Sequence, residues 1–312
     1  METFLHSVAS VAIILLLTAT GYFCAAKGWM GREAKAFISK FVMRIAIPAM
    51  CVYGLTNNLT HEMVVESWRM LLVPFICLTL LFLLSFLAGK LLKLPRRQLG
   101  VFMMMASLSN SVFVGYAMCS ELFGDVCTPH VMLYYLVSTS FTQLVGLTLI
   151  RWSGESGERL PFGKALRKFI TTPTVLGVLL GFVLVLGDIQ LPSLVTSYLR
   201  YMNNMVSPLA LLLTGQIIHE IGLKNLRFDR VQGVIMFFRF LLSPALCALL
   251  CAVFGVSGLG RSVFMVESAM PVVTQTVVAS AEYGADEQLA AQGAALSTLA
   301  CFVVIPVLMM LL

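Results

Sequence analysis

Long apolar windows recur along the whole chain, and they constrain its fold more than any other feature. Their lengths are close to the roughly 20 residues that an α-helix needs to cross a bilayer. Charged residues make up only 12% of the 312 residues, and the mean hydropathy of +0.93 is typical of a polytopic membrane protein. We therefore predict an all-α membrane protein with ten transmembrane helices, at residues 4–26, 33–55, 68–92, 98–119, 126–151, 171–187, 198–218, 231–255, 262–281 and 288–311.

Positive charge is distributed unevenly between the two sides of these windows. Sixteen of the 21 lysines and arginines fall in the loops between windows 1 and 2, 3 and 4, 5 and 6, and 7 and 8, whereas Arg69, Arg200 and Arg261 lie on the other side. Cytoplasmic loops of membrane proteins carry such an excess. We expect a multi-pass protein of the cell inner or plasma membrane with both termini extracytoplasmic. The net charge of +6 then needs no nucleic-acid partner.

The second half of the chain repeats motifs of the first half in the same order. The corresponding pairs are Pro48 and Pro208, Gly54 and Gly215, Arg69 and Arg239, Glu121 and Glu282, and Ser138 and Ser297. Each half has five predicted helices, an odd number, so the second half enters the membrane from the opposite side. We therefore predict two inverted five-helix repeats, at 1–152 and 171–312, joined by a cytoplasmic linker at 153–170.

Polar residues interrupt the apolar windows at two corresponding places. The first is the segment ASLSNSVFVGYA at 106–117, and the repeat offset leads from its Asn110 to Pro271 in the second. Proline removes a helical hydrogen bond, and serine and asparagine side chains offer the backbone other partners. We expect the fourth and ninth helices to break here. Unwound backbone inside a membrane is tolerated where it lines a cavity, and free helix N-termini favour an anion such as a carboxylate.

The residues around these two breaks are the predicted substrate site. Asn110 would bind the substrate or orient the broken backbone, and its polar neighbours would line the cavity. The alternative is that small and polar residues merely let the helices pack closely. The predicted crossover and substrate-binding residues are Ser109, Asn110, Ser111, Gly115, Pro271, Thr274 and Gln275.

Several motifs resemble those of the auxin efflux carrier family. The segment SNSVFVGYA (109–117) is similar to the asparagine-glycine motif of helix 4 in that family, commonly GNTGFxGxP. Further matches are SPLALLLTGQ (207–216), AMP (269–271) followed by ASAEYGAD (279–286), and LSTLACFVVIPVLMML (296–311). The likeness extends in order over essentially the whole chain.

The resemblance implies a carrier of organic anions, such as auxin in plants and dicarboxylates like malate or malonate in bacteria. The family's fold is similar to that of bile acid sodium symporters, in the bile/arsenite/riboflavin-type transporter superfamily. It has a scaffold domain, to which helices 1, 2, 6 and 7 would belong, and a core domain whose helices 4 and 9 break and cross. On that pattern Asn110 and Gly115 belong to the first crossing and Pro271 to the second. This sequence departs from the motif at 111–112, where Ser-Val replaces Thr-Gly, and at 116–117, where Tyr-Ala lacks the proline.

Three ionisable side chains are further candidates. Glu267 lies one helical turn before Pro271, and its repeat counterpart is Ala106, so a carboxylate present in only one half is a coupling candidate for a proton or another cation. A later start of the ninth helix would instead leave Glu267 near the outer interface. Arg239 and Arg69 are secondary candidates that could attract an anion or pair with a carboxylate. Snorkelling to the interface, or a structural ion pair, is the favoured explanation for both arginines.

We interpret the chain as a secondary active transporter of a small organic anion, working by alternating access as an efflux or proton-coupled carrier. A sodium-coupled symporter of the same fold is the alternative, since Glu267, Gln275 and nearby hydroxyls offer oxygen ligands. An intramembrane enzyme or a scaffold protein is a remote alternative, because the acids and the four histidines are dispersed. We expect no cofactor and no metal site, since the eight cysteines form no CxxC pair. The expected partners are the anion, a proton or sodium ion, and the bilayer; a homodimer is compatible with the sequence.

Overall fold

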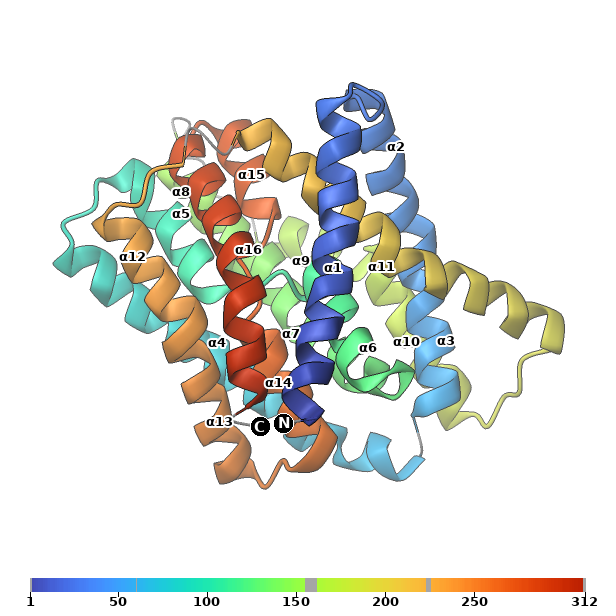
Figure 1. Ribbon diagram of the computed structural model, residues 1–312. Coiled ribbons are helices and arrows are strands. Elements are labelled where there is room, and N and C mark those ends of the chain that lie inside the picture. Colours follow the sequence, from blue (N-terminus) through green and yellow to red (C-terminus); the bar gives the residue numbers. More distant parts are fainter. Residues whose placement is uncertain (1, 60, 155–161, 223–225, 311–312) are drawn as a thin grey trace.

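The computed structural model describes residues 2–59, 61–154, 162–222 and 226–310, and apart from one isolated β-bridge its regular structure is helical (Figure 1). The first half contains α1 (Glu2–Ala26), α2 (Arg32–Phe41), η1 (Val42–Ala46), α3 (Ile47–Asn58), α4 (His61–Leu91), α5 (Arg96–Ser107), η2 (Ser111–Tyr116), α6 (Ala117–Phe123), η3 (Asp125–Cys127), α7 (Thr128–Phe141), η4 (Thr142–Gly146) and α8 (Leu147–Ser153). The second half contains α9 (Phe162–Ile170), α10 (Pro173–Leu186), α11 (Ser193–Ile221), α12 (Arg230–Phe237), η6 (Phe238–Leu242), α13 (Ser243–Phe254), α14 (Gly258–Ser268), α15 (Gln275–Tyr283) and α16 (Glu287–Met309).

Six helical stretches of the described chain are long and apolar enough to cross a membrane, as a polytopic membrane protein requires. They are Ala9–Ala26, Arg32–Asn58, Trp68–Leu91, Asp125–Ser153, Arg230–Phe254 and Glu287–Met309. The segments Ser111–Phe123 and Pro173–Leu186 are apolar but shorter. The windows predicted at 98–119 and 262–281 each contain a break, so neither forms one uninterrupted helix. Both ends of the chain lie at the same end of the molecule (Figure 1).

The predicted linker at 153–170 contains a short amphipathic helix. This helix is α9, whose Lys164 and Arg167 side chains are exposed to solvent. Residues 155–161 of the predicted linker lie outside the described residues.

Glycines allow two pairs of helices to approach each other at backbone distance. Gly215 of α11 faces the backbone of α1, where an added Cβ would overlap the carbonyl oxygen of Thr18 and lie 2.6 Å from the amide nitrogen of Tyr22. Gly177 of α10 lies against α3, where an added Cβ would lie 2.8 Å from the carbonyl oxygen of Pro48. Small residues at such contacts are the usual basis of helix association in lipid. Helices α1, α3, α10 and α11 therefore form one packed group, and α1 crosses in front of α11 in Figure 1.

The remaining long helices form a second group around the two breaks. α4 packs against α5, α7 and α13; α5 packs against α8; and α14 packs against α13 and α7. α15 packs against α16 and α8. Similar contacts occur in the two halves: before the breaks α4 packs on α5 and α13 on α14, and after them η2 packs on α7 and α15 on α16. After the first break, η2 also packs against α11 of the first group.

The close contact between α1 and α11 predicts a specific stability effect. Replacing Gly215 with Ala should lower the free energy of unfolding by about 1–3 kcal/mol, because the new methyl group meets rigid backbone. Gly233→Ala in α12 is the matched control, since its Cβ would make only an ordinary contact, 3.6 Å from the Phe228 ring. Both changes gain the same helix propensity. Thermal unfolding in detergent measures the difference, and equal melting temperatures would contradict the close approach.

Candidate functional site

The two helix breaks cross each other and are joined by backbone hydrogen bonds. The first break separates α5, which ends at Ser107, from η2, and the second separates α14, which ends at Ser268, from α15. The amide of Asn110 donates to the carbonyl oxygen of Pro271 at 2.8 Å, and an antiparallel bridge joins Ser109 to Val272. Each unwound segment therefore satisfies part of the other's backbone, which a membrane interior requires.

Side chains reinforce the crossing. The Asn110 amide nitrogen Nδ2 donates to Thr274 Oγ1 at 2.9 Å, so a predicted site residue of one break binds one of the other. The Ser297 hydroxyl in α16 accepts from the amide of Val272 at 3.0 Å, and its repeat counterpart Ser138 in α7 lies 3.5 Å from the Ser111 hydroxyl. These two serines, matched in the sequence only as a repeated pair, each contact the break in their own half.

Arg239 holds the C-terminal ends of both broken helices. Its side chain is completely buried, and it donates to the carbonyl oxygens of Ser268 at 2.7 Å, Met270 at 2.8 and 3.1 Å, and Ser107 at 3.2 Å. Ser107 and Ser268 are the last residues of α5 and α14, where helical carbonyls lack partners and carry partial negative charge. Arg239 therefore neither snorkels nor pairs with a carboxylate among the described residues, whereas its counterpart Arg69 lies at the surface over the Trp68 ring.

Glu267 lies behind the crossing, at the end of α14. The side chain is completely buried, and a Cβ on Gly115 would lie 2.5 and 2.7 Å from its two carboxylate oxygens, so a larger residue there would have to displace the carboxylate. The Cys119 thiol donates to Oε1 at 3.6 Å, whereas Oε2 has no hydrogen-bond partner in the described chain. An ionised carboxylate without a cationic partner is costly to bury. Glu267 and Gly115 are therefore in contact in the structure, although they are separate candidates in the sequence.

The helices that follow the two breaks, η2 and α15, begin at a central cavity of about 290 Å³. Neither η2 nor α15 has a side-chain cap at its start, and the amides of Thr276 and Val277 bond instead to the carbonyl oxygens of Val273 and Thr274. The cavity wall combines the crossing with α7, η4, α2 and α11, and none of its described lining residues is acidic. The polar residues that line it are Lys35, Ser39, Ser109, Asn110, Ser111, Tyr135, Ser138, Thr139, Thr142, Gln143, Thr172, Thr214, Thr274 and Gln275.

A wider hollow continues from this cavity toward one end of the molecule. It measures about 690 Å³ and shares Lys35, Ile217, Thr274 and Val278 with the central cavity. Its outer part is lined by charged residues, namely Glu220, Arg227 and Glu287. We call it the vestibule. The central cavity is therefore accessible from the end of the molecule at which α11 ends and α16 begins.

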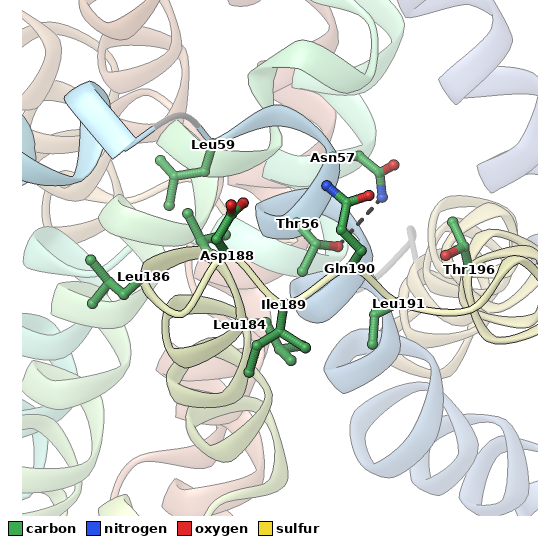
Figure 2. A pocket seen from close by; sticks show the side chains of 11 residues that line it. Thr56, Asn57, Leu59, Leu184, Leu186, Asp188, Ile189, Gln190, Leu191 and Thr196 are labelled. Atoms are coloured by element: carbon green, nitrogen blue, oxygen red, sulfur yellow. Dashed lines mark hydrogen bonds between the residues drawn. The ribbon is translucent and has the colours of Figure 1, made fainter.

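Another hollow, shown in Figure 2, is lined by none of the residues of the breaks. It measures about 630 Å³ and lies between the end of α3, the end of α10 and the following loop, which includes Gln190. Its Thr56 and the cavity's Lys35 belong to one continuous helical rod and are roughly 30 Å apart at 1.5 Å rise per residue. None of the predicted site residues lines this hollow, so we take the central cavity as the candidate site.

The structure groups the predicted site residues in three places. Ser109, Asn110, Ser111, Thr274 and Gln275 line the cavity. Pro271 lies in the crossing itself, and Gly115 lies behind it against Glu267. Arg239 holds the carbonyl ends, and Arg69 is remote at the surface.

Sequence reasoning missed several residues of the cavity wall. In the sequence Lys35 is only one of the loop cations, and no motif marks Thr142, Gln143 or Thr214, yet all four line the cavity. Polar residues inside the apolar windows at 126–151 and 198–218 are the signal that could have found the last three. The structure shows one further feature of the wall, since the π-helical segments η1, η2 and η4 all contribute residues to it.

Comparison with known proteins gives a consistent result over nearly the whole chain. A family model described as "Membrane transport protein" matches residues 6–309. The chain is 28% identical over 293 residues to an uncharacterized transporter of Methanocaldococcus jannaschii, covering 92% of this chain and 93% of that protein. It is 24% identical over 312 residues to an uncharacterized transporter of Methanothermobacter thermautotrophicus, covering 97% of each. Neither relative's name states a substrate.

The Arg239 contacts predict that charge alone cannot replace this side chain. Arg239→Lys keeps the positive charge but cannot reach three separate carbonyl groups, and each buried carbonyl left unpaired costs about 1–3 kcal/mol. We expect a loss of several kcal/mol, measured as a large drop in melting temperature in detergent. Arg69→Lys is the matched control and should change little, since that side chain is exposed. Equal stability of the two variants would refute the role of Arg239.

Proposed function

Since this chain belongs to the membrane transport protein family, the auxin efflux carrier family that its motifs resemble, we propose that it is a secondary active carrier of a small organic anion. As a member of a transporter family, it is not an enzyme. The proposed substrate is a mono- or dicarboxylate such as malate or malonate. The carrier moves it by alternating access, either as efflux or coupled to protons.

One observation carries the proposed substrate class. The polar groups that line the central cavity are hydroxyls, amides and one lysine, with no carboxylate among the described residues, and the rest of the wall is apolar. The starts of η2 and α15, which have no side-chain cap, add partial positive charge at the same wall. Lysine, hydroxyls and side-chain amides all donate hydrogen bonds to an anion. The volume of about 290 Å³ suits a small solute.

We propose a membrane architecture of ten spans in two inverted repeats. In this proposal 1–152 and 171–312 are the repeats, 153–170 is a cytoplasmic linker, and both termini are extracytoplasmic. The helix contacts support it, because α1 packs on α11 and α3 packs on α10, the two equivalent pairings of such a repeat. The charge distribution along the sequence supports the orientation.

Alternating access is supported by where the cavity lies and how it is closed. Its wall is shared between α2, η1 and α11 on one side and the crossing on the other, which would be scaffold and core. On the side away from the vestibule, the Tyr116 hydroxyl donates to Asn203 Oδ1 of α11 at 2.8 Å, and both side chains are buried. This conformation corresponds to a carrier open toward the cytoplasm and closed on the other side.

Transport through this cavity predicts a strong effect of Asn110. Asn110→Ala removes the bond to Thr274 and an amide from the cavity wall, so we expect uptake of malonate or malate to fall at least about tenfold. Radiolabelled uptake into proteoliposomes measures it, and gel filtration checks that the variant is folded. Asn57→Ala, at the exposed end of α3, is the matched control and should transport normally. Undiminished transport by the folded Asn110→Ala variant would remove Asn110 from the site.

Glu267 is the proposed coupling residue, and its surroundings favour a proton over sodium. Sodium needs several oxygen ligands, whereas a thiol and the backbone of Gly115 lie against this carboxylate and one of its oxygens is unpaired. A proton needs only that free oxygen.

We therefore expect wild-type uptake to respond to a pH gradient and to be unchanged when potassium replaces sodium. Glu267→Gln keeps the shape of the side chain and should abolish the response to the pH gradient while solute exchange continues. Glu282→Gln at the surface is the control for a lost carboxylate. Uptake that requires sodium and ignores the pH gradient would instead establish the sodium symporter.

A further inference from the structure

Lys35 is the one charged side chain among the described residues that line the central cavity, and its counterion lies outside that cavity. Its Nζ forms an ion pair with Glu220 Oε2, the only salt bridge in the described chain. Lys35 lines both the cavity and the vestibule, whereas Glu220 lines the vestibule alone. The lysine therefore stands at the boundary between the two spaces.

Glu220 has a second polar contact besides Lys35. Glu220 Oε1 accepts from Gln216 Nε2 at 3.5 Å, and the same Nε2 donates to the carbonyl oxygens of Met30 at 3.0 Å and Gly31 at 3.3 Å. These contacts tie the acidic partner to the turn before α2. The lysine ammonium, on a flexible four-carbon stem and about one-third exposed, has three donors to redistribute.

We propose that Lys35 exchanges its ion-pair partner, leaving Glu220 for the carboxylate of the transported solute when that solute enters the cavity. Glu220 is then a built-in competitor that occupies the lysine in the empty carrier. The inference rests on the proposed function, since it assigns the full positive charge of the binding site to Lys35 and the partial charges to the starts of η2 and α15.

Competition with Glu220 also explains selection among anions. An anion that contacts only Lys35 forms one ion pair and breaks the one between Lys35 and Glu220, so it gains no further contacts. A carboxylate in the cavity also reaches the hydroxyls and the Asn110 side of the crossing, so it gains bonds that Glu220 cannot make from the vestibule. In the vestibule, by contrast, the positive charges of Lys35 and Arg227 are balanced by the negative charges of Glu220 and Glu287, so that space has no excess of positive charge for an anion.

Calorimetric titration of the detergent-purified full chain with sodium malonate tests the exchange, with malonamide as the neutral probe. Lys35→Met should weaken malonate binding about tenfold, because it removes a charged hydrogen-bond donor. Glu220→Gln should tighten binding about twofold to fivefold, because an exposed ion pair no longer competes. In the double variant the tightening should disappear. Lys40→Met and Glu282→Gln are the matched controls, since both side chains are exposed and neither lines the cavity or the vestibule, and malonamide should not respond to any change.

The opposite signs make the outcome decisive. Malonate that binds Glu220→Gln no more tightly than wild type, or Lys35→Met as tightly as wild type, would overturn the exchange and leave the proposed anion carrier intact. Weaker binding in both single variants would assign the ion pair a structural role and would also overturn it. Failure of every mono- and dicarboxylate to bind the folded wild-type protein would overturn the proposed function, and the exchange with it.

Discussion

The guanidinium group of Arg239 is the contact on which the rest of this site depends. Two helices stop inside the protein, and each leaves carbonyl groups that lipid cannot solvate. One buried cation donates hydrogen bonds to the carbonyl ends of both, at Ser107 and at Ser268 and Met270. Arg239 thus balances the partial negative charge at the C-terminal ends of α5 and α14. The N-terminal ends of η2 and α15, which carry partial positive charge, face the cavity.

Three charged side chains near the crossing illustrate how surroundings, more than residue type, set a role. Arg239 is buried among carbonyl oxygens and acts on the backbone. Glu267 is equally buried, against Gly115 and without a cationic partner in the described chain, so its ionised form is costly to bury, which is the basis of its proposed coupling role. Lys35 is partly exposed and already paired with Glu220, so its charge is available for exchange.

The sequence predicted the positions of the breaks well, for a physical reason. Proline at 271 and the hydroxyl and amide side chains at 109–111 weaken the helical hydrogen bonds of their own segment. Their effect can therefore be predicted from that segment alone. The same approach failed for Arg239, because neither snorkelling nor an ion pair among the described residues accounts for it. Arg69 and Arg239 share one motif, yet one lies at the surface and the other inside, because burial depends on which helices pack around each.

The sequence by itself therefore determined a polytopic helical membrane chain, the likeness of its halves and the places where two helices stop, since hydropathy and proline act within one segment. Only the tertiary structure decided that Asn110 meets Thr274, that Gly115 lies against Glu267, and that Lys35 reaches the cavity. Each of these joins residues from different helices. Their meeting depends on close packing between backbones, as at Gly215 and Thr18, which no single segment encodes.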